Sequence, residues 1–166
     1  MTENIAKESY VRTDLLRDGR KVSIRAIRPE DKPVLQETLH HLSKQSQYFR
    51  FFTPKDDLTE KELEFFTDID FVHHVGLLAS IVSDHEEFPA GVGRYIMSDD
   101  ETGSASAELA FTVAEEFQGM GIGTNVINEF LNELKTNYPD ILRVELIARK
   151  TNPAIKLYKK LGFVKD

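Results

Sequence analysis

Three glycines at alternate positions in the stretch FQGMGIGTNV, residues 117–126, constrain this chain more than any other feature. The stretch lies between a strand-like alternation at residues 107–113 and an amphipathic helical pattern that starts at Ile122. The first amides of a helix have no partner within it, and the helix dipole favours an anion there. Because glycines carry no Cβ atom, an anion can approach this backbone closely. The stretch therefore predicts a phosphate-binding turn between a strand and a helix.

Two other phosphate-binding motifs fit the letters less well. The NTPase loop needs Gly-Lys before its Ser or Thr, whereas Gly123 is followed directly by Thr124. The dinucleotide fingerprint needs its third glycine three positions after the second, early in a βαβ unit, whereas this stretch follows antiparallel-looking strands. An NTPase and a dinucleotide site are therefore disfavoured. A glycine-rich turn with packing value alone remains an alternative, and Gln118 could add a side-chain donor.

The remaining periodicities predict an α/β or α+β fold in which helices cover a sheet. Strands are expected at residues 11–16, 20–27, 75–82, 91–97, 107–113 and 141–148, with another beginning at residue 163. Helices are expected from residue 32 to 43, after a capping box at Thr59 and Glu62, from residue 122 to before Pro139, and from 152 to 162. Polar loops are expected at residues 83–89 and 98–104.

Length and composition limit the class of protein. The 166 residues contain no linker-like segment, so one domain is expected over residues 11–166, after a flexible N-terminus at residues 1–10. Without cysteine there is no disulfide, thiolate metal site or cysteine nucleophile. The net charge of −7 argues against nucleic acid or a membrane as partner. No apolar run approaches the roughly 20 residues of a membrane span, so a cytoplasmic protein is expected. Adjacent histidines at 40–41 and 73–74 suit no metal.

Two separated motifs resemble a known family. Residues 118–123, QGMGIG, are similar to the pyrophosphate loop of the GNAT acyl-CoA N-acyltransferases, and residues 152–163, NPAIKLYKKLGF, are similar to that family's terminal helix. Residues 22–31, 42–43 and 48–52 further resemble the GNAT domain of bacterial Pat-type protein-lysine acetyltransferases. The resemblance implies a GNAT-like mixed, mostly antiparallel sheet with splayed parallel central strands and about four flanking helices.

The resemblance also implies acetyl-CoA as the cofactor, held between the strands at residues 107–113 and 141–148. Backbone groups at residues 111–113 would bind the pantetheine arm, and the glycine stretch would bind the pyrophosphate. The expected cofactor-binding residues are Phe111, Thr112, Val113, Gln118, Gly119, Met120, Gly121, Ile122, Gly123, Thr124 and Asn152. Asn152 serves equally well as a helix N-cap.

The expected catalytic residues are Glu108 and Tyr158. An amine that attacks a thioester must first lose a proton, and Glu108 matches the glutamate assigned as general base in Pat-type enzymes. Burial beside apolar neighbours would suit that role; a solvated strand face is its alternative, and Glu145 is the rival carboxylate. Tyr158 matches the family tyrosine that protonates the leaving thiolate, with packing on the sheet as its alternative.

The expected function is acetyl-CoA-dependent N-acetyltransfer directly to a primary amine, with a protein lysine as the preferred acceptor. Transfer to a small amine such as an amino acid or polyamine, and a non-catalytic CoA-binding sensor or interaction module, remain alternatives. Family members continue past Gly162-Phe163 through a long strand and a last one, so a homo-oligomer or a shortened chain is expected. Arg50, Phe51 and Phe52 are expected in a packed helix-turn segment and have no further assigned role.

Overall fold

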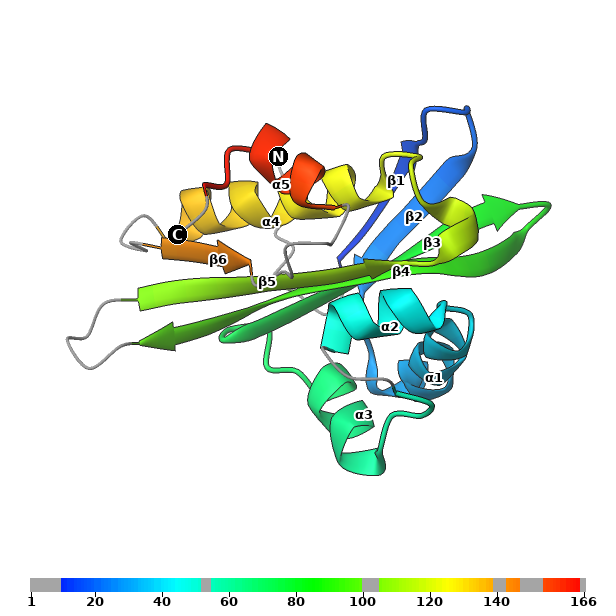
Figure 1. Cartoon of the computed structure of the whole chain (residues 1–166), viewed down its shortest axis with the longest axis horizontal. Helices are drawn as coiled ribbons and strands as arrows, with labels where there is room; N and C mark the ends of the chain where they lie inside the picture. The colour runs from blue at the N-terminus through cyan, green and yellow to red at the C-terminus, as the bar shows by residue number, and fades with distance from the viewer. Residues whose placement is uncertain (1–9, 52–54, 100–104, 139–142, 147–153, 165–166) are drawn as a thin grey trace.

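A computed structural model describes residues 10–51, 55–99, 105–138, 143–146 and 154–164 (Figure 1). The described strands form one six-stranded sheet in chain order. They are β1 Val11–Leu15, β2 Lys21–Ala26, β3 His74–Ser83, β4 Glu86–Asp99, β5 Ala105–Val113 and β6 Arg143–Leu146. Neighbouring strands are antiparallel except β5 and β6, which run parallel. This arrangement confirms the predicted mixed, mostly antiparallel sheet.

The parallel strands β5 and β6 pair along only part of the length of β5. Their pairing runs from Ser106 opposite Arg143 to Leu109 opposite Leu146, whereas β5 continues to Val113. The last part of β5 is therefore paired only with β4 among the described residues. Unpaired strand groups on that side can accept another extended chain or ligand.

Helices cover both faces of the sheet (Figure 1). On one face lie α1 Lys32–His40, α2 Lys44–Phe51 and α3 Glu60–Thr67, and on the other lie α4 Ile122–Asn137 and α5 Ile155–Lys160. Two short 3₁₀ turns, Pro29–Asp31 and Glu115–Phe117, precede α1 and α4. No helix in the described ranges is both long and apolar enough to cross a membrane.

The larger core lies between the sheet and α4. Its helix residues Ile122, Val126, Ile127, Phe130 and Leu134 are all buried, as the amphipathic pattern predicts. Gly93 of β4 allows the close approach, because a Cβ atom there would lie 2.5 Å from Val126 Cγ1. A smaller cluster of Leu35, Leu39, Leu42 and Leu58 holds the helices of the opposite face. The close contact between β4 and α4 at Gly93 fixes the strand and the start of the helix relative to each other.

Local signals explain several boundaries. The predicted capping box is present, since Thr59 Oγ1 accepts from the Glu62 amide and Glu62 accepts from the Thr59 amide, both at 3.1 Å. Gly19 takes the left-handed backbone (φ +87°) in the predicted β1–β2 turn. Gly162 (φ +100°) ends α5 in the same way.

The structure corrects three predictions. The loop expected at residues 83–89 is wrong, because Asp84 and His85 alone form the turn with left-handed backbones, and β4 already begins at Glu86. The helical region before Pro54 contains a second helix, α2, beyond the one expected to end near residue 43. Phe163 and Val164 form no strand; the Phe163 amide instead donates to Tyr158 O (3.0 Å) and closes α5.

Candidate active site

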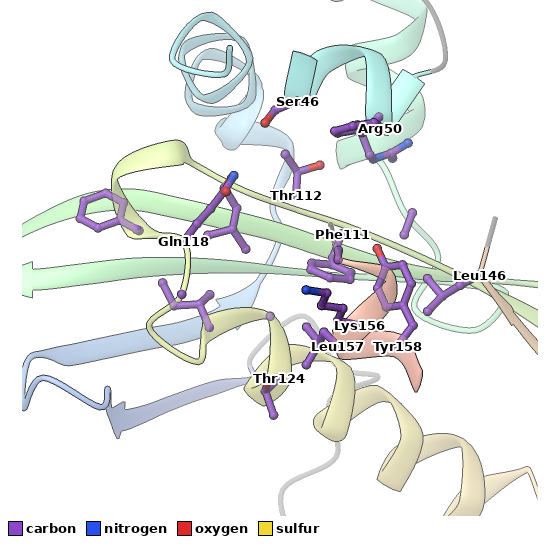
Figure 2. Close-up of a pocket in the computed structure, with 18 of the residues that line it drawn as sticks. Ser46, Arg50, Phe111, Thr112, Gln118, Thr124, Leu146, Lys156, Leu157 and Tyr158 are labelled. Atoms are coloured by element: carbon purple, nitrogen blue, oxygen red, sulfur yellow. The ribbon is translucent and has the colours of Figure 1, made fainter. Parts of the chain in front are cut away.

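A cavity of about 650 Å³ connects the two faces of the molecule beside β5. Residues of α2 form one side, and the β5–α4 connection, the start of α4 and α5 form the other (Figure 2). It brings together both expected catalytic residues and nine of the eleven expected cofactor-binding residues, namely Phe111, Thr112, Val113, Gln118, Gly119, Gly121, Ile122, Gly123 and Thr124. Segments that are distant in the sequence therefore share one cleft.

The glycine stretch has the backbone of an anion-binding turn. Gly119 (φ +79°) and Gly121 (φ +96°) are both left-handed, a conformation that other residues adopt only with strain. Gly121 is the N-cap of α4, and its carbonyl accepts the first helical bond, from the Asn125 amide at 3.0 Å. The amides of Ile122, Gly123 and Thr124 precede that bond and have no acceptor within the helix.

The third glycine has a packing role as well. A Cβ atom on Gly123 would lie 2.8 Å from Phe111 Cε2, so the glycine lets the ring of β5 rest on the first turn of α4. On its other side the Phe111 ring meets Tyr158 edge to face, with centroids 5.7 Å apart. Phe111 thus joins the loop to α5 across the cleft (Figure 2).

Two residues of the motif lie differently from the simple expectation. The side-chain amide of Gln118 donates to the Val113 carbonyl (3.0 Å), so it braces the turn against the end of β5. Met120 is absent from the residues that line the cavity, and its sulfur accepts from Arg20 Nη2 at 2.8 Å. Asn152 lies outside the described residues, and its expected contact stays a prediction.

Glu108 lies on the α1–α3 side of β5, because its neighbours Ala107 and Leu109 are buried in the core beneath α4. Its side chain is exposed, which differs from the burial expected of it, and it lines the cavity. The rival Glu145 is its partner in the parallel register but does not line the cavity. Of the two carboxylates, Glu108 is the one that meets the cleft.

Tyr158 projects from α5 with its hydroxyl toward the side of the cleft where Arg50 lies (Figure 2). Burial raises the pKa of Tyr158 to about 12, although the positive charge of Arg50 opposes that rise. The phenol therefore keeps its proton at neutral pH. It can donate that proton to a group that becomes basic during a reaction.

Glu115 connects the two sides of the cleft, a contact that the sequence did not reveal. Its Oε1 accepts from the backbone amide of Ser43 (3.2 Å), from Ser43 Oγ (2.7 Å) and from Ser46 Oγ. Partial desolvation alone would raise the pKa of Glu115, but the hydrogen bonds from Ser46 and Ser43 outweigh it and lower the pKa. The carboxylate therefore stays ionised and holds the start of α2 against the segment that leads into the glycine stretch.

Cations gather near the glycine stretch, and the sequence had not indicated Arg17 among them. Arg17, in the β1–β2 turn, donates its backbone amide to Met120 O (3.4 Å), and its Nε lies 3.6 Å from the position of a Cβ built on Gly121. Arg17 lines the cavity together with Lys156 and Lys160 of α5. Arg17 lies about 100 residues before the loop in the sequence, so no local pattern indicated that the two are in contact. The same is true of Arg20 and Met120.

The family model described as "Acetyltransferase (GNAT) family" matches residues 37–163. A curated acetyltransferase of Pseudomonas aeruginosa is 28% identical over 122 residues, which are 74% of this chain and 64% of that protein. The chain thus spans slightly less than two thirds of that relative. Among solved structures, the GNAT domain of S. lividans PAT superposes with a TM-score of 0.80 at 27% identity, covering 94% of this chain and 89% of that one.

A Clostridium acetobutylicum structure described as a predicted acetyltransferase with acetyl-CoA has a TM-score of 0.64 at 18% identity, covering 87% of this chain and 91% of its own. It is similar in fold. Together the family model, the curated relative and the PAT domain confirm the expected fold and the expected family. The chain belongs to the acetyltransferase (GNAT) family.

Proposed function

We propose that this protein transfers an acetyl group from acetyl-CoA directly to the side-chain amine of a protein lysine. The observation that carries this proposal is the single cleft that Glu108, Tyr158 and the glycine turn share. A base, a proton donor and an anion-binding turn in one cavity are the groups that direct transfer to an amine requires.

The residues present fit acetyl-CoA. The free amides at the start of α4 suit a pyrophosphate, and Arg17, Lys156 and Lys160 add positive charge around the cavity. Among the described residues, the part of β5 beyond Leu109 pairs only with β4, so its other edge could bind an extended amide-containing arm. When bound, acetyl-CoA would supply an activated acyl group as a thioester.

Glu108 would take a proton from the incoming ammonium group. A lysine amine with an unperturbed pKa near 10.4 is overwhelmingly protonated at neutral pH, so attack needs this deprotonation. Because the Glu108 side chain is exposed, it can receive the proton directly or through one water molecule. The free amine would then attack the thioester carbon, and as the C–S bond breaks the nitrogen would give up a second proton to water, which leaves the amide.

Tyr158 would hold a proton at Oη for the departing sulfur. Its raised pKa, about 12, keeps the phenol protonated until that moment. The Phe111 ring packs against it edge to face and restricts where the hydroxyl can point. Glu108 on β5 would thereby accept one proton from the amine, and Tyr158 on α5 would supply one to the sulfur and regain it from solvent.

Two observations support a protein lysine as the acceptor. The chain's motifs at residues 22–31 and 48–52 resemble Pat-type protein-lysine acetyltransferases, and its fold is similar to the GNAT domain of S. lividans PAT. Glu108 is also exposed, so a lysine on another protein's surface can reach it.

The test is acetyl transfer from acetyl-CoA to a panel of proteins and free amines, read by mass spectrometry of intact products. We expect acetylated lysines in at least one protein of the panel and little transfer to polyamines. Transfer restricted to free amines would replace protein lysine by a small acceptor. Tight acetyl-CoA binding without any transfer would indicate a CoA-binding module instead.

A further inference from the structure

Arg50 is a cation in the wall of the cleft that the proposed chemistry leaves unused. It projects from α2, is half-buried, and lines both the main cavity and a small adjoining cavity of about 50 Å³. Its guanidinium lies over the rings of Phe51 (4.8 Å to the centroid) and Phe66 (5.9 Å). Aromatic faces attract such a cation but satisfy none of its N–H donors as an oxygen would.

A second arginine lies behind the first. Arg94 of β4 is 4% exposed, and its guanidinium also lies over the Phe66 ring, 4.3 Å from the centroid. It contacts Phe66 O (3.2 Å) and His74 Nε2 (2.8 Å), which are both neutral partners. Burial, and then the charge of Arg50, lower the pKa of Arg94 to about 9, so it remains charged at neutral pH.

Neither cation has an acidic partner in direct contact. Across the described parts of the chain, no carboxylate oxygen lies within 4.0 Å of either guanidinium. Burial lowers the pKa of Arg50, and the charge of Glu108 only partly opposes this. A desolvated cation without a paired anion is costly, so its retention in a cleft points to an anion that arrives with a ligand.

The location of Arg50 identifies that ligand. In the proposed function the phosphates of acetyl-CoA are bound at the other end of the cleft, by the glycine turn and Arg17. Arg50 instead lies on the α2 side, where Glu108 of β5 also faces the cavity. An anion at this end therefore belongs to the acceptor, whose amine must approach Glu108.

We propose that Arg50 forms a carboxylate-binding subsite for the acceptor, so that the preferred amine is a lysine with an acidic group beside it. This inference rests on the proposed acetyltransfer. A planar guanidinium binds a carboxylate through two parallel hydrogen bonds, which gives direction as well as affinity. The same positive wall disfavours polyamines, because they would bring a further cation next to Arg50.

The test uses acceptors that differ in one carboxylate. Three peptides with a single lysine carry Glu, Gln or Arg beside it, and free lysine is compared with 1,5-diaminopentane, which is the same chain without the carboxylate. For the wild type we expect kcat/KM to be about tenfold higher for the Glu peptide than for the Gln peptide. A matching gap between free lysine and the diamine would show that an amino-acid carboxylate also suffices.

Arg50→Gln should reduce the Glu-over-Gln preference to within about twofold, while the rate with the Gln peptide changes little. Arg50→Lys, which keeps the charge but not the planar fork, should retain part of the preference. Lys44→Gln is the matched control, since it removes a positive charge from the same helix at a side chain that is 85% exposed. It should leave the preference unchanged.

An undiminished preference in Arg50→Gln, or an equal loss of rate with all acceptors, would overturn the subsite. Thermal unfolding by circular dichroism, with Arg50→Lys as the second variant, separates loss of structure from loss of recognition. If the wild type acetylates no amine, the proposed function fails; calorimetric binding of the Glu and Gln peptides to the CoA-bound protein still tests the carboxylate contact. Equal affinities in wild type and Arg50→Gln would then reject it.

Discussion

At one end of the cleft, residues 119–124 offer backbone amides, and glycine matters there because it has no side chain and can adopt a left-handed backbone. At the other end, Glu108, Arg50 and Tyr158 offer charges and a hydroxyl that come from three different elements. The first end depends on local backbone geometry, whereas the second depends on how α2, β5 and α5 pack together. Substitutions should therefore affect the two ends differently: affinity for the cofactor at the first, turnover and acceptor choice at the second.

The largest effect is expected from Glu108→Gln, which removes the proposed base but keeps the shape of the side chain. It should lower kcat by about a hundredfold or more and change the acetyl-CoA dissociation constant by less than about twofold. Steady-state kinetics and calorimetry measure the two quantities. Glu145→Gln, the neighbour in register, is the control and should retain most activity. Equal losses in both variants would remove Glu108 from its role as base.

Gly121→Val should show the opposite pattern. At φ +96° a β-branched residue is strained, and relief of that strain would turn the first amides of α4 away from the cleft. We expect the acetyl-CoA dissociation constant to rise by about tenfold or more in calorimetry. Gly162→Val carries a similar strain at φ +100° outside the loop and is the control. Unaltered binding in Gly121→Val would refute the phosphate role of the turn.

Tyr158→Phe should lower kcat by about tenfold while leaving stability nearly unchanged, because the edge-to-face contact with Phe111 survives. The pKa of Tyr158, about 12, also predicts that the wild-type rate shows no loss from this group until the pH approaches that value. A pH–rate profile of wild type and variant tests both points. A variant as active as the wild type would leave Tyr158 with its packing role alone.

Arg17→Gln tests whether the phosphate end extends beyond the turn itself. The loss of one exposed cation should weaken acetyl-CoA binding by about fivefold, with a larger effect at low ionic strength. Lys21→Gln removes a charge from the same hairpin at a residue that does not line the cavity. If Arg17→Gln and Lys21→Gln bind acetyl-CoA with equal affinity at every salt concentration, Arg17 contributes only to the overall electrostatic field of the protein.

The smallest effect concerns the wall behind Arg50. Burial, and then the charge of Arg94, lower the pKa of His74 to about 4, whereas an unfolded histidine titrates near 6.5. As the pH falls from 6.5 to 4 the unfolded state binds the proton first, so stability is lost over this window. His74→Gln keeps an acceptor for Arg94 and should lose about 1–2 kcal/mol less than the wild type between pH 7 and 4.5.

Urea unfolding at a series of pH values measures this difference. The control is His41→Gln, at the exposed C-cap of α1. Its stability should change with pH as that of the wild type does. A wild-type curve that matches the His74→Gln curve would show that the pKa of His74 is the same in the folded and unfolded states.

The contrast between the two ends also explains what the sequence could predict. The glycine turn was found because its whole requirement lies within residues 117–126, where left-handed backbone and a helix start follow from residue type. The helix that follows it was found for the same reason. The tight turn at Asp84 and His85 was missed, because neither residue is a glycine and polar letters alone indicate a loop.

The other end could not be derived from local patterns. Ser46 and Glu115 are 69 residues apart, and only the packing of α2 on the sheet brings them together. The surroundings of Arg50 depend on Phe66 and Arg94, which come from two other elements, so the sequence around Arg50 could not indicate a role for it. Glu108 and Tyr158 were selected by their likeness to a family, and spacing alone would not have chosen between Glu108 and Glu145.

The hydrogen bonds of Glu115 have a consequence for engineering. Ser43, just before the helix that carries Arg50, and Ser46 within that helix hydrogen-bond to Glu115, the acid just before the glycine turn. A designer who replaces α2 to change the acceptor would also release that acid and disturb the cofactor end. When α2 is exchanged between related proteins, Ser43, Ser46 and Glu115 should therefore be exchanged together with it.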